Sequence, residues 1–328
     1  MAANKMIETS GFSYTTLNQP EWYYQSLKKA KTIDNGYVRV LANITKDARI
    51  KKLVMAENTI SQVDNRDCDW SPTQRFEFDE ATITVKNFKI NEEQCLEELD
   101  NVYSEMLFNS IGATKDKWPA VGSPENLEDV IMFHLQNALS QDVERLIWGG
   151  ESNSVDGIHD GIYDKAAADS DTIKVDNAVT IDSTNVLSEI QRVWEAIPDR
   201  VLQDEEFDPE KAAVRIFVSS DIMRYLKQAL STVPTAYQVQ LPAFTIDANG
   251  TIRYLGVEIV SVGLPANTMI AASKDNLYFG TDLLSDTQEI RVAMGKELMN
   301  ENKWYAKGAY RADAGYIFGD ELVLYATA

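Results

Sequence analysis

The sequence predicts an α+β fold, and three local patterns support this prediction. A long apolar stripe between residues 123 and 150 predicts one extended helix. A strand that runs directly into a helix, over residues 213–230, is typical of a lobe that mixes the two element types. From Ile252 onward, short apolar runs separated by glycines predict mostly strands. The chain has 328 residues, of which 44% are hydrophobic and 25% charged, as in a globular protein of about two domains.

Residues 1–40 mix aromatic and polar residues and lack sustained periodicity, apart from one possible short helix at residues 20–30. We expect this segment to lie as an arm across another surface. Residues 1–60 hold nine Lys or Arg and five Asp or Glu, a net of +4, whereas the whole chain carries −20 and the remainder therefore −24. An acidic body of a neighbouring copy would attract such an arm, and a partner within the same chain would explain the pattern equally well.

The next segment reads as a long hairpin. Residues 49–57 and 75–90 predict two strands around a polar tip, with period two at Phe76 and Phe78 and again at Ile83 and Val85. The apolar positions then change parity, which predicts a bulge or twist near Asn87. A lone hairpin is at best marginally stable in water, so we expect other structure to support it.

The strongest local pattern predicts a helix of roughly 24 residues, about 36 Å long. Ser123 can cap it, Pro124 suits its first position, and Gly149 with Gly150 can end it. The apolar residues recur mainly every four positions, as expected for one buried stripe. They are Leu127, Ile131, Leu135, Leu139, Val143 and Ile147, with Val130 and Ala138 widening the stripe.

The remaining elements alternate between helix and strand before the β-rich end. Residues 184–198 predict a helix that buries one face. The residues expected on that face are Leu187, Ile190, Val193 and Ile197. The strand at residues 213–219 and the helix at 219–230 follow, and strands are expected at 252–263, 268–280, 288–295 and 302–326.

No pattern of catalytic or cofactor-binding residues occurs. The chain lacks a P-loop, a dinucleotide fingerprint and a nucleophile elbow. Cys68 and Cys95 fit neither a disulfide framework nor a zinc site, and His134 within the long helix is read as a structural imidazole. We therefore predict no catalytic site, no cofactor and no metal.

Two acidic segments were weighed as cation sites. His159 stands near Asp156, Asp160 and Asp164, which could in principle supply oxygen ligands, but a glycine-rich acidic turn needs no ion and is the favoured reading. The acids at the hairpin tip fail the calcium-loop template and are expected to be solvated. These tip residues are Asp64, Asp67 and Asp69.

Charge and hydropathy exclude further classes. A net charge of −20 disfavours broad contact with nucleic-acid phosphates, so no sequence-specific nucleic-acid binding is expected. No apolar run approaches the ~18 residues of a membrane span, and the first residues lack the pattern of a secretory signal. We expect synthesis in the cytoplasm and no membrane association.

The order of these pieces resembles the major capsid proteins of tailed bacteriophages, which share the Hong Kong 97-like fold. The segment Ile90-Asn91-Glu92-Glu93 and the later Leu96-Glu97-Glu98-Leu99 resemble the family's acidic segment after its E-loop hairpin. Gly149-Gly150 matches the glycine pair near the end of the family's spine helix. In the C-terminal third, Leu255-Gly256-Val257, Leu264-Pro265 and Ile270 resemble another family segment, although Glu258 replaces its usual proline step and Lys274-Asp275 its glycine-aspartate pair.

The resemblance implies four units and a structural function. They are an N-arm (1–40), an E-loop (41–90), a peripheral domain with the spine helix (91–154 and 262–315) and an axial domain (155–261 and 316–328). It implies a non-enzymatic subunit that assembles into pentamers and hexamers of an icosahedral shell around a double-stranded DNA genome. The implied location is the virion capsid, assembled in the host cytoplasm, with separate scaffolding, portal and decoration proteins as further partners.

Candidate contacts between subunits lie in the arm and in the hairpin. The residues are Trp22, Tyr23, Lys28, Lys29, Lys51, Lys52, Trp70, Arg75, Phe76 and Phe78. Two other functions remain open at this stage. One is an encapsulin-type nanocompartment shell, whose members usually open with a helix. The other is a cytosolic enzyme that uses the acidic turn at residues 156–164.

Overall fold

Two sheets and one long helix organise the protein, for which we describe a computed structural model. The structure describes residues 30–44, 46–55, 76–95, 127–149, 160–203, 214–232, 243–247, 250–282, 291–294 and 303–327. The expected arm before residue 30 and the hairpin tip lie outside the described residues. The fold is mixed helix and sheet, so the predicted α+β class is confirmed.

The first sheet has five strands and joins distant parts of the sequence. Its path is β1 (Arg39–Leu41), β11 (Leu277–Thr281), β13 (Lys303–Tyr316) and β12 (Arg291–Met294), and β4 (Lys86–Cys95) also pairs with β13. Residues 304–307 of β13 pair with both β12 and β4, so these two strands lie on opposite edges of β13. The outer edge of β4 is therefore an edge of the described sheet.

The second sheet has seven strands, and strands near the end of the sequence lie inside it. Its order is β5 (Ile173–Lys174), β14 (Val323–Ala326), β10 (Thr268–Ser273), β6 (Val214–Val218), β9 (Val257–Ser261), β8 (Ile252–Tyr254) and β7 (Phe244–Ile246). β6 and β9 pair in parallel, while β10 runs antiparallel to both of its neighbours. Central strands carry apolar residues on both faces, which predicts that both faces are covered.

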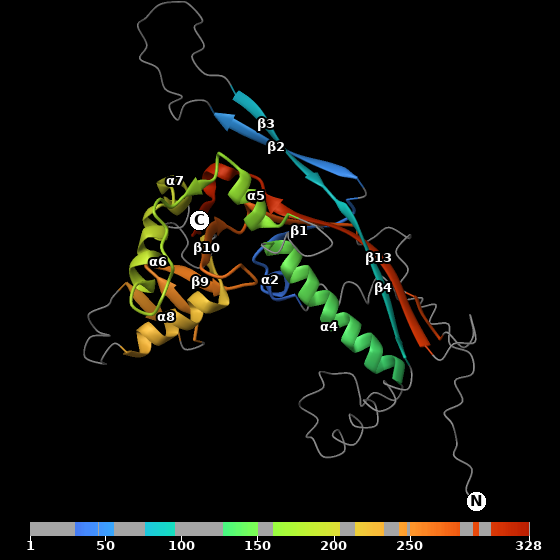
Figure 1. Cartoon of the computed structure of the whole chain (residues 1–328). Coiled ribbons are helices and arrows are strands. Elements are labelled where there is room, and N and C mark those ends of the chain that lie inside the picture. The colour runs from blue at the N-terminus through green and yellow to red at the C-terminus, as the bar shows by residue number, and fades with distance from the viewer. Residues whose placement is uncertain are drawn as a thin grey trace, which may run out of the picture.

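Helices cover the second sheet on one side, and the first sheet with α4 lies on the other (Figure 1). α6 (Val186–Glu195) and α8 (Ser220–Thr232) pack on the face that carries Ile216 and Val218, while Phe217 and Ile270 face α4 (Leu127–Trp148). The short elements are α2 (Lys31–Asp34), α5 (Ile162–Ala168), α7 (Asp199–Gln203) and the 3-10 turn η3 (Gly319–Glu321).

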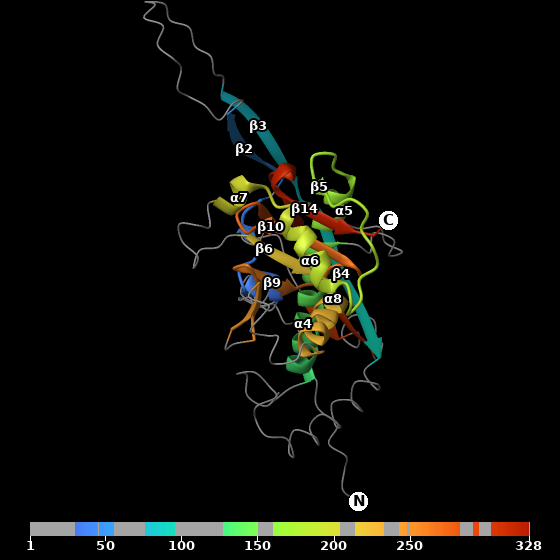
Figure 2. The ribbon, with the colours of Figure 1, turned by 90° about the vertical axis from the view of Figure 1, so that its left-hand side faces the viewer.

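A two-stranded hairpin extends beyond the rest of the described chain. It consists of β2 (Asp47–Met55) and β3 (Phe76–Thr84), paired antiparallel over their full length. In two perpendicular views its far end points away from both sheets (Figure 1, Figure 2).

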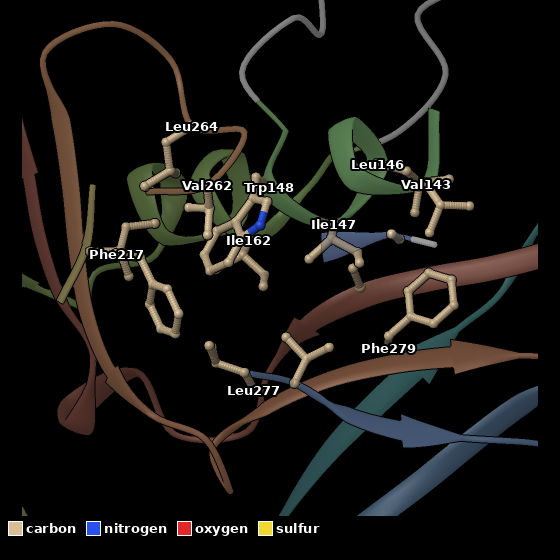
Figure 3. Packing of buried hydrophobic residues seen from close by; sticks show 14 of the residues in the cluster. Val143, Leu146, Ile147, Trp148, Ile162, Phe217, Val262, Leu264, Leu277 and Phe279 are labelled. Carbon is tan, nitrogen blue, oxygen red and sulfur yellow. The ribbon is translucent and has the colours of Figure 1, made fainter. Parts of the chain in front are cut away.

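The predicted long helix is confirmed as α4, with 22 residues. Its last three turns bury Leu139, Val143 and Ile147, and Trp148 packs on Phe217 with ring centroids 4.7 Å apart (Figure 3). The stripe rotates toward this end, because Leu146 and Trp148 are buried. Ala138, which was expected to widen it, is exposed.

Gly149 ends the helix with φ +75°, a backbone conformation that glycine adopts without steric cost. None of the described helices is long and apolar enough to cross a membrane.

Four details differ from the sequence-based expectations. The predicted arm boundary at residue 40 is too late, because Ala30, Thr32 and Val38 are buried and β1 pairs with β11. The predicted boundary at residue 262 separates β10 from the sheet to which it belongs.

The parity change of the hairpin strand occurs at Val85, where β3 ends and β4 begins to pair with a new partner. On α6 the fully buried position is Val186, and Leu187 is only partly buried.

Candidate assembly surfaces

The base of the hairpin is fixed to the five-stranded sheet. Ile83 of β3 is fully buried and packs with Ile44 and Tyr278, and Ile50 and Val85 pack around this cluster. Among the described residues, β2 and β3 pair only with each other. The hairpin thus has an apolar anchor at one end and two unpaired backbone edges along its length.

In the distal half of the hairpin, the apolar positions lie on the side opposite to those at its base. The register pairs Leu53 with Phe78 and Met55 with Phe76. Because opposite positions of an antiparallel ladder share a side and successive positions alternate, these four lie on the side opposite to Ile83. Two of the predicted contact residues, Phe76 and Phe78, are therefore placed together on one side of the ribbon.

The cations predicted for contact stand opposite acids of the same hairpin. Lys51 is the register partner of Glu80 and Lys52 that of Asp79. Arg49 forms an exposed ion pair with Glu80, Nη1 to Oε2 3.2 Å, and such exposed pairs contribute at most about 1 kcal/mol. The hairpin is therefore close to charge balance along β2 and β3.

The first described residues are firmly packed on the body. Thr32 is fully buried, and its hydroxyl donates to Oε1 of Glu144 at 2.5 Å while its backbone N–H donates to Oε2 at 3.0 Å. Trp148 donates from Nε1 to the same hydroxyl at 2.8 Å. These hydrogen bonds tie α2 to α4.

Six of the predicted contact residues and several predicted acidic sites fall outside the described residues. The contact residues are Trp22, Tyr23, Lys28, Lys29, Trp70 and Arg75. The acidic-site residues are Asp64, Asp67, Asp69, Asp156 and His159, and the side chain of His134 on α4 is likewise not described.

The described half of the acidic turn performs a local structural role. Asp164 accepts a hydrogen bond from the backbone N–H of Gly161 at 3.1 Å, which caps the start of α5. Within the described segments no group of three or more His, Cys, Asp or Glu side chains could hold a metal ion.

Sequence reasoning did not find a partly buried ion pair that joins α5 to the five-stranded sheet. Lys165 Nζ lies 2.7 Å from Oδ1 of Asp313, whose side chain is 4% exposed, and also donates to the carbonyl of Ala314 at 2.6 Å. Burial, followed by the nearby Asp313 carboxylate, raises the pKa of Tyr278 well above its ordinary value. The one hint in the sequence is that Asp313 stands among small residues, between Ala312 and Ala314, within a predicted strand.

The geometry as a whole is that of the Hong Kong 97-like phage capsid fold: a projecting hairpin, a long helix on an elongated sheet, and a second lobe of sheet and helices. One solved structure with this fold is the satellite phage P4 procapsid including the size determination (Sid) protein. Its TM-score is 0.51 at 9% sequence identity, over 92% of this chain and 98% of that one.

A second is the capsid of the native GTA particle, with a TM-score of 0.51 at 10% identity, over 99% of this chain and 94% of that one. No family model matches the sequence, and no curated protein matches it. The likeness therefore confirms the predicted fold by shape at very low sequence identity.

Proposed function

We propose that this chain is the major capsid protein of a tailed bacteriophage. Its copies form pentamers and hexamers, which join into an icosahedral shell around a double-stranded DNA genome. The fold shared with a phage procapsid and a GTA capsid supports this function. The projecting hairpin is the observation that carries it.

The hairpin suits a contact with a neighbouring copy. A two-stranded ribbon is marginally stable unless an apolar side is covered. In the part of the chain that the structure describes, the body packs against the base of the hairpin, around Ile83, while the register puts Leu53, Met55, Phe76 and Phe78 on the other side at the far end. A neighbouring copy that covers the far side would also pair or shield the free edges of β2 and β3.

Such a contact is heterologous, because a hairpin of one copy meets a different surface of the next. Heterologous contacts that close by rotation give rings, and rings joined at their edges give a closed shell. The role is structural and non-enzymatic. Separate scaffolding, portal and decoration proteins complete the assembly, which takes place in the host cytoplasm.

Negative-stain electron microscopy of the purified protein tests the proposal. We expect shells or rings from the wild type and only unassembled, folded subunits from Phe76→Ser/Phe78→Ser. Val179→Ser is the matched control, because Val179 is an exposed apolar residue (45%) that lies away from the hairpin.

A strict monomer at high concentration contradicts the proposal, as does normal assembly of the hairpin variant. Shells that co-purify with an enzyme cargo instead of closing around DNA would indicate a nanocompartment.

A further inference from the structure

The outer side of the five-stranded sheet carries a row of cations. Residues that alternate along β13 share a side, and the side that carries Ala306, Tyr310 and Ala312 is buried against the α4 layer. The other side carries Lys303, Lys307 and Arg311. The register places Lys89 of β4 opposite Ala309, on that same outer side. We name Lys89, Lys303, Lys307 and Arg311 the basic face.

Side-chain contacts confirm this placement. Arg311 donates from Nε to Oδ1 of Asn87 at 2.7 Å, and Lys303 Nζ lies 3.5 Å from Oε1 of Glu93. Both contacts cross from β13 to β4 on the outer side. Lys89 and Lys307 are exposed and have no ion-pair partner among the described residues.

The basic face is positively charged, whereas the protein as a whole is negatively charged. Its four cations accompany two carboxylates, the exposed Glu93 and the buried Asp282, which gives +2 against −20 for the chain and leaves −22 for the rest. Asp282 is buried and lies 3.4 Å from Nη1 of Arg311, and Asp313 is buried and paired with Lys165. A solvated partner therefore meets mainly positive charge.

We infer that the basic face is a docking surface for an acidic surface of a second copy of this chain. The inference rests on the proposed function, since a shell brings every copy against others. Acidic surface is abundant on such a partner: residues 160–203 alone hold nine Asp or Glu against four Lys or Arg, a net of −5. Complementary charge of this kind fixes orientation and speeds encounter.

A nucleic-acid phosphate backbone fits the basic face less well. A duplex would have to approach a protein of net charge −20 and would place phosphates beside Glu93. An acidic protein surface carries fewer charges and can leave a gap at that carboxylate. The observations thus favour a second copy over DNA.

Charge reversal on the full-length protein tests the inference. Lys89→Glu/Lys307→Glu changes the net charge by −4, and Lys227→Glu/Lys274→Glu changes it equally at two exposed lysines outside the basic face. We expect the first variant to raise the concentration needed for assembly by about tenfold or more in sedimentation velocity. The control should assemble like the wild type, and both should keep the wild-type melting temperature.

Each other outcome has a definite meaning. If the wild type assembles and the two variants behave alike, the basic face is not a docking surface, while the proposed function stands. If the wild type never assembles, the proposed function fails first. If the wild type binds a short random-sequence DNA duplex and Lys89→Glu/Lys307→Glu loses this binding yet assembles normally, the face binds phosphate and the inference is overturned.

Discussion

Thr32 and Glu144 are 112 residues apart in the sequence, yet Glu144 caps the short helix α2, in whose first turn Thr32 lies. The carboxylate accepts from the Thr32 hydroxyl at 2.5 Å and from its backbone N–H at 3.0 Å. A side chain of α4 thus supplies what a capping residue of α2 would normally supply from its own sequence neighbourhood. The carboxylate of Glu144 therefore helps to fix α2 on α4.

Replacing Glu144 with alanine should destabilise the subunit by about 1–3 kcal/mol, because the buried N–H of Thr32 loses its acceptor. Urea denaturation of the unassembled subunit measures the change. Glu144→Gln keeps an acceptor and should cost less, and Arg145→Ala, one exposed residue along the helix, should change little. Unchanged stability of the alanine variant would show that the cap is not formed.

Lys165→Met should cost about 3 kcal/mol, because it leaves the Asp313 carboxylate buried without its cation. The methionine keeps most of the aliphatic stem, so lost packing contributes little. The double variant Lys165→Met/Asp313→Asn should be more stable than the single variant, since no uncompensated charge remains. Equal unfolding free energies for Lys165→Met and the wild type would refute the buried pair.

Gly149→Ala should prevent accumulation of folded protein. A Cβ at this position would lie 2.8 Å from the backbone N and Cα of Gly161 and 2.3 Å from Asp164, in addition to the cost of φ +75°. Gly250→Ala is a matched control, because its φ is +80° but nothing lies within 4 Å of the added atom.

The control should therefore show only the conformational cost, about 1 kcal/mol. Soluble yield and melting temperature of the two variants distinguish the steric clash with Gly161 and Asp164 from the cost of the positive φ angle. Similar values for both would mean that the junction between α4 and α5 can open.

Stability should fall at alkaline pH through Tyr325. The Tyr325 hydroxyl lies 2.7 Å from Oε2 of Glu189 and 2.9 Å from both the N–H and the carbonyl oxygen of Val179. Burial, and next the hydrogen bond to Glu189, raise its pKa to about 12. In the unfolded chain this tyrosine ionises at pH ~10. Its contribution to the free energy of unfolding is therefore complete below that pH and is lost as the pH rises toward 12.

Denaturation at about pH 8 and about pH 11 measures this effect. Tyr325→Phe should be less stable at the lower pH and show a shallower loss between the two. Some loss should remain, because burial also raises the pKa values of Tyr278, Tyr310 and Tyr316. An identical slope for wild type and variant would exclude a role for Tyr325.

Local patterns were sufficient to predict the elements but not their partners. The four-residue spacing through Leu139, Val143 and Ile147 correctly predicted α4, because burial of one helix face leaves a periodic trace. Nothing comparable marks strand order. β13 pairs with β4, β11 and β12, and its own residues do not encode which edge meets which partner.

The same limit applies to the candidate site. The period-two aromatics Phe76 and Phe78 were visible in the sequence. The basic face was not, because Lys89 and Lys307 come from strands more than two hundred residues apart and meet only through the register of β4 and β13. Likewise, Thr32 was assigned to an arm because its capping partner stands far away in the chain.

The interior place of β14 sets the order of events during synthesis. Val323 and Tyr325 are fully buried, and the strand lies between β5 and β10. While residues 323–326 are still inside the ribosome, β10 lacks one of its two neighbouring strands, and its edge on that side is unpaired. The seven-stranded sheet can therefore be completed only after translation has passed this segment.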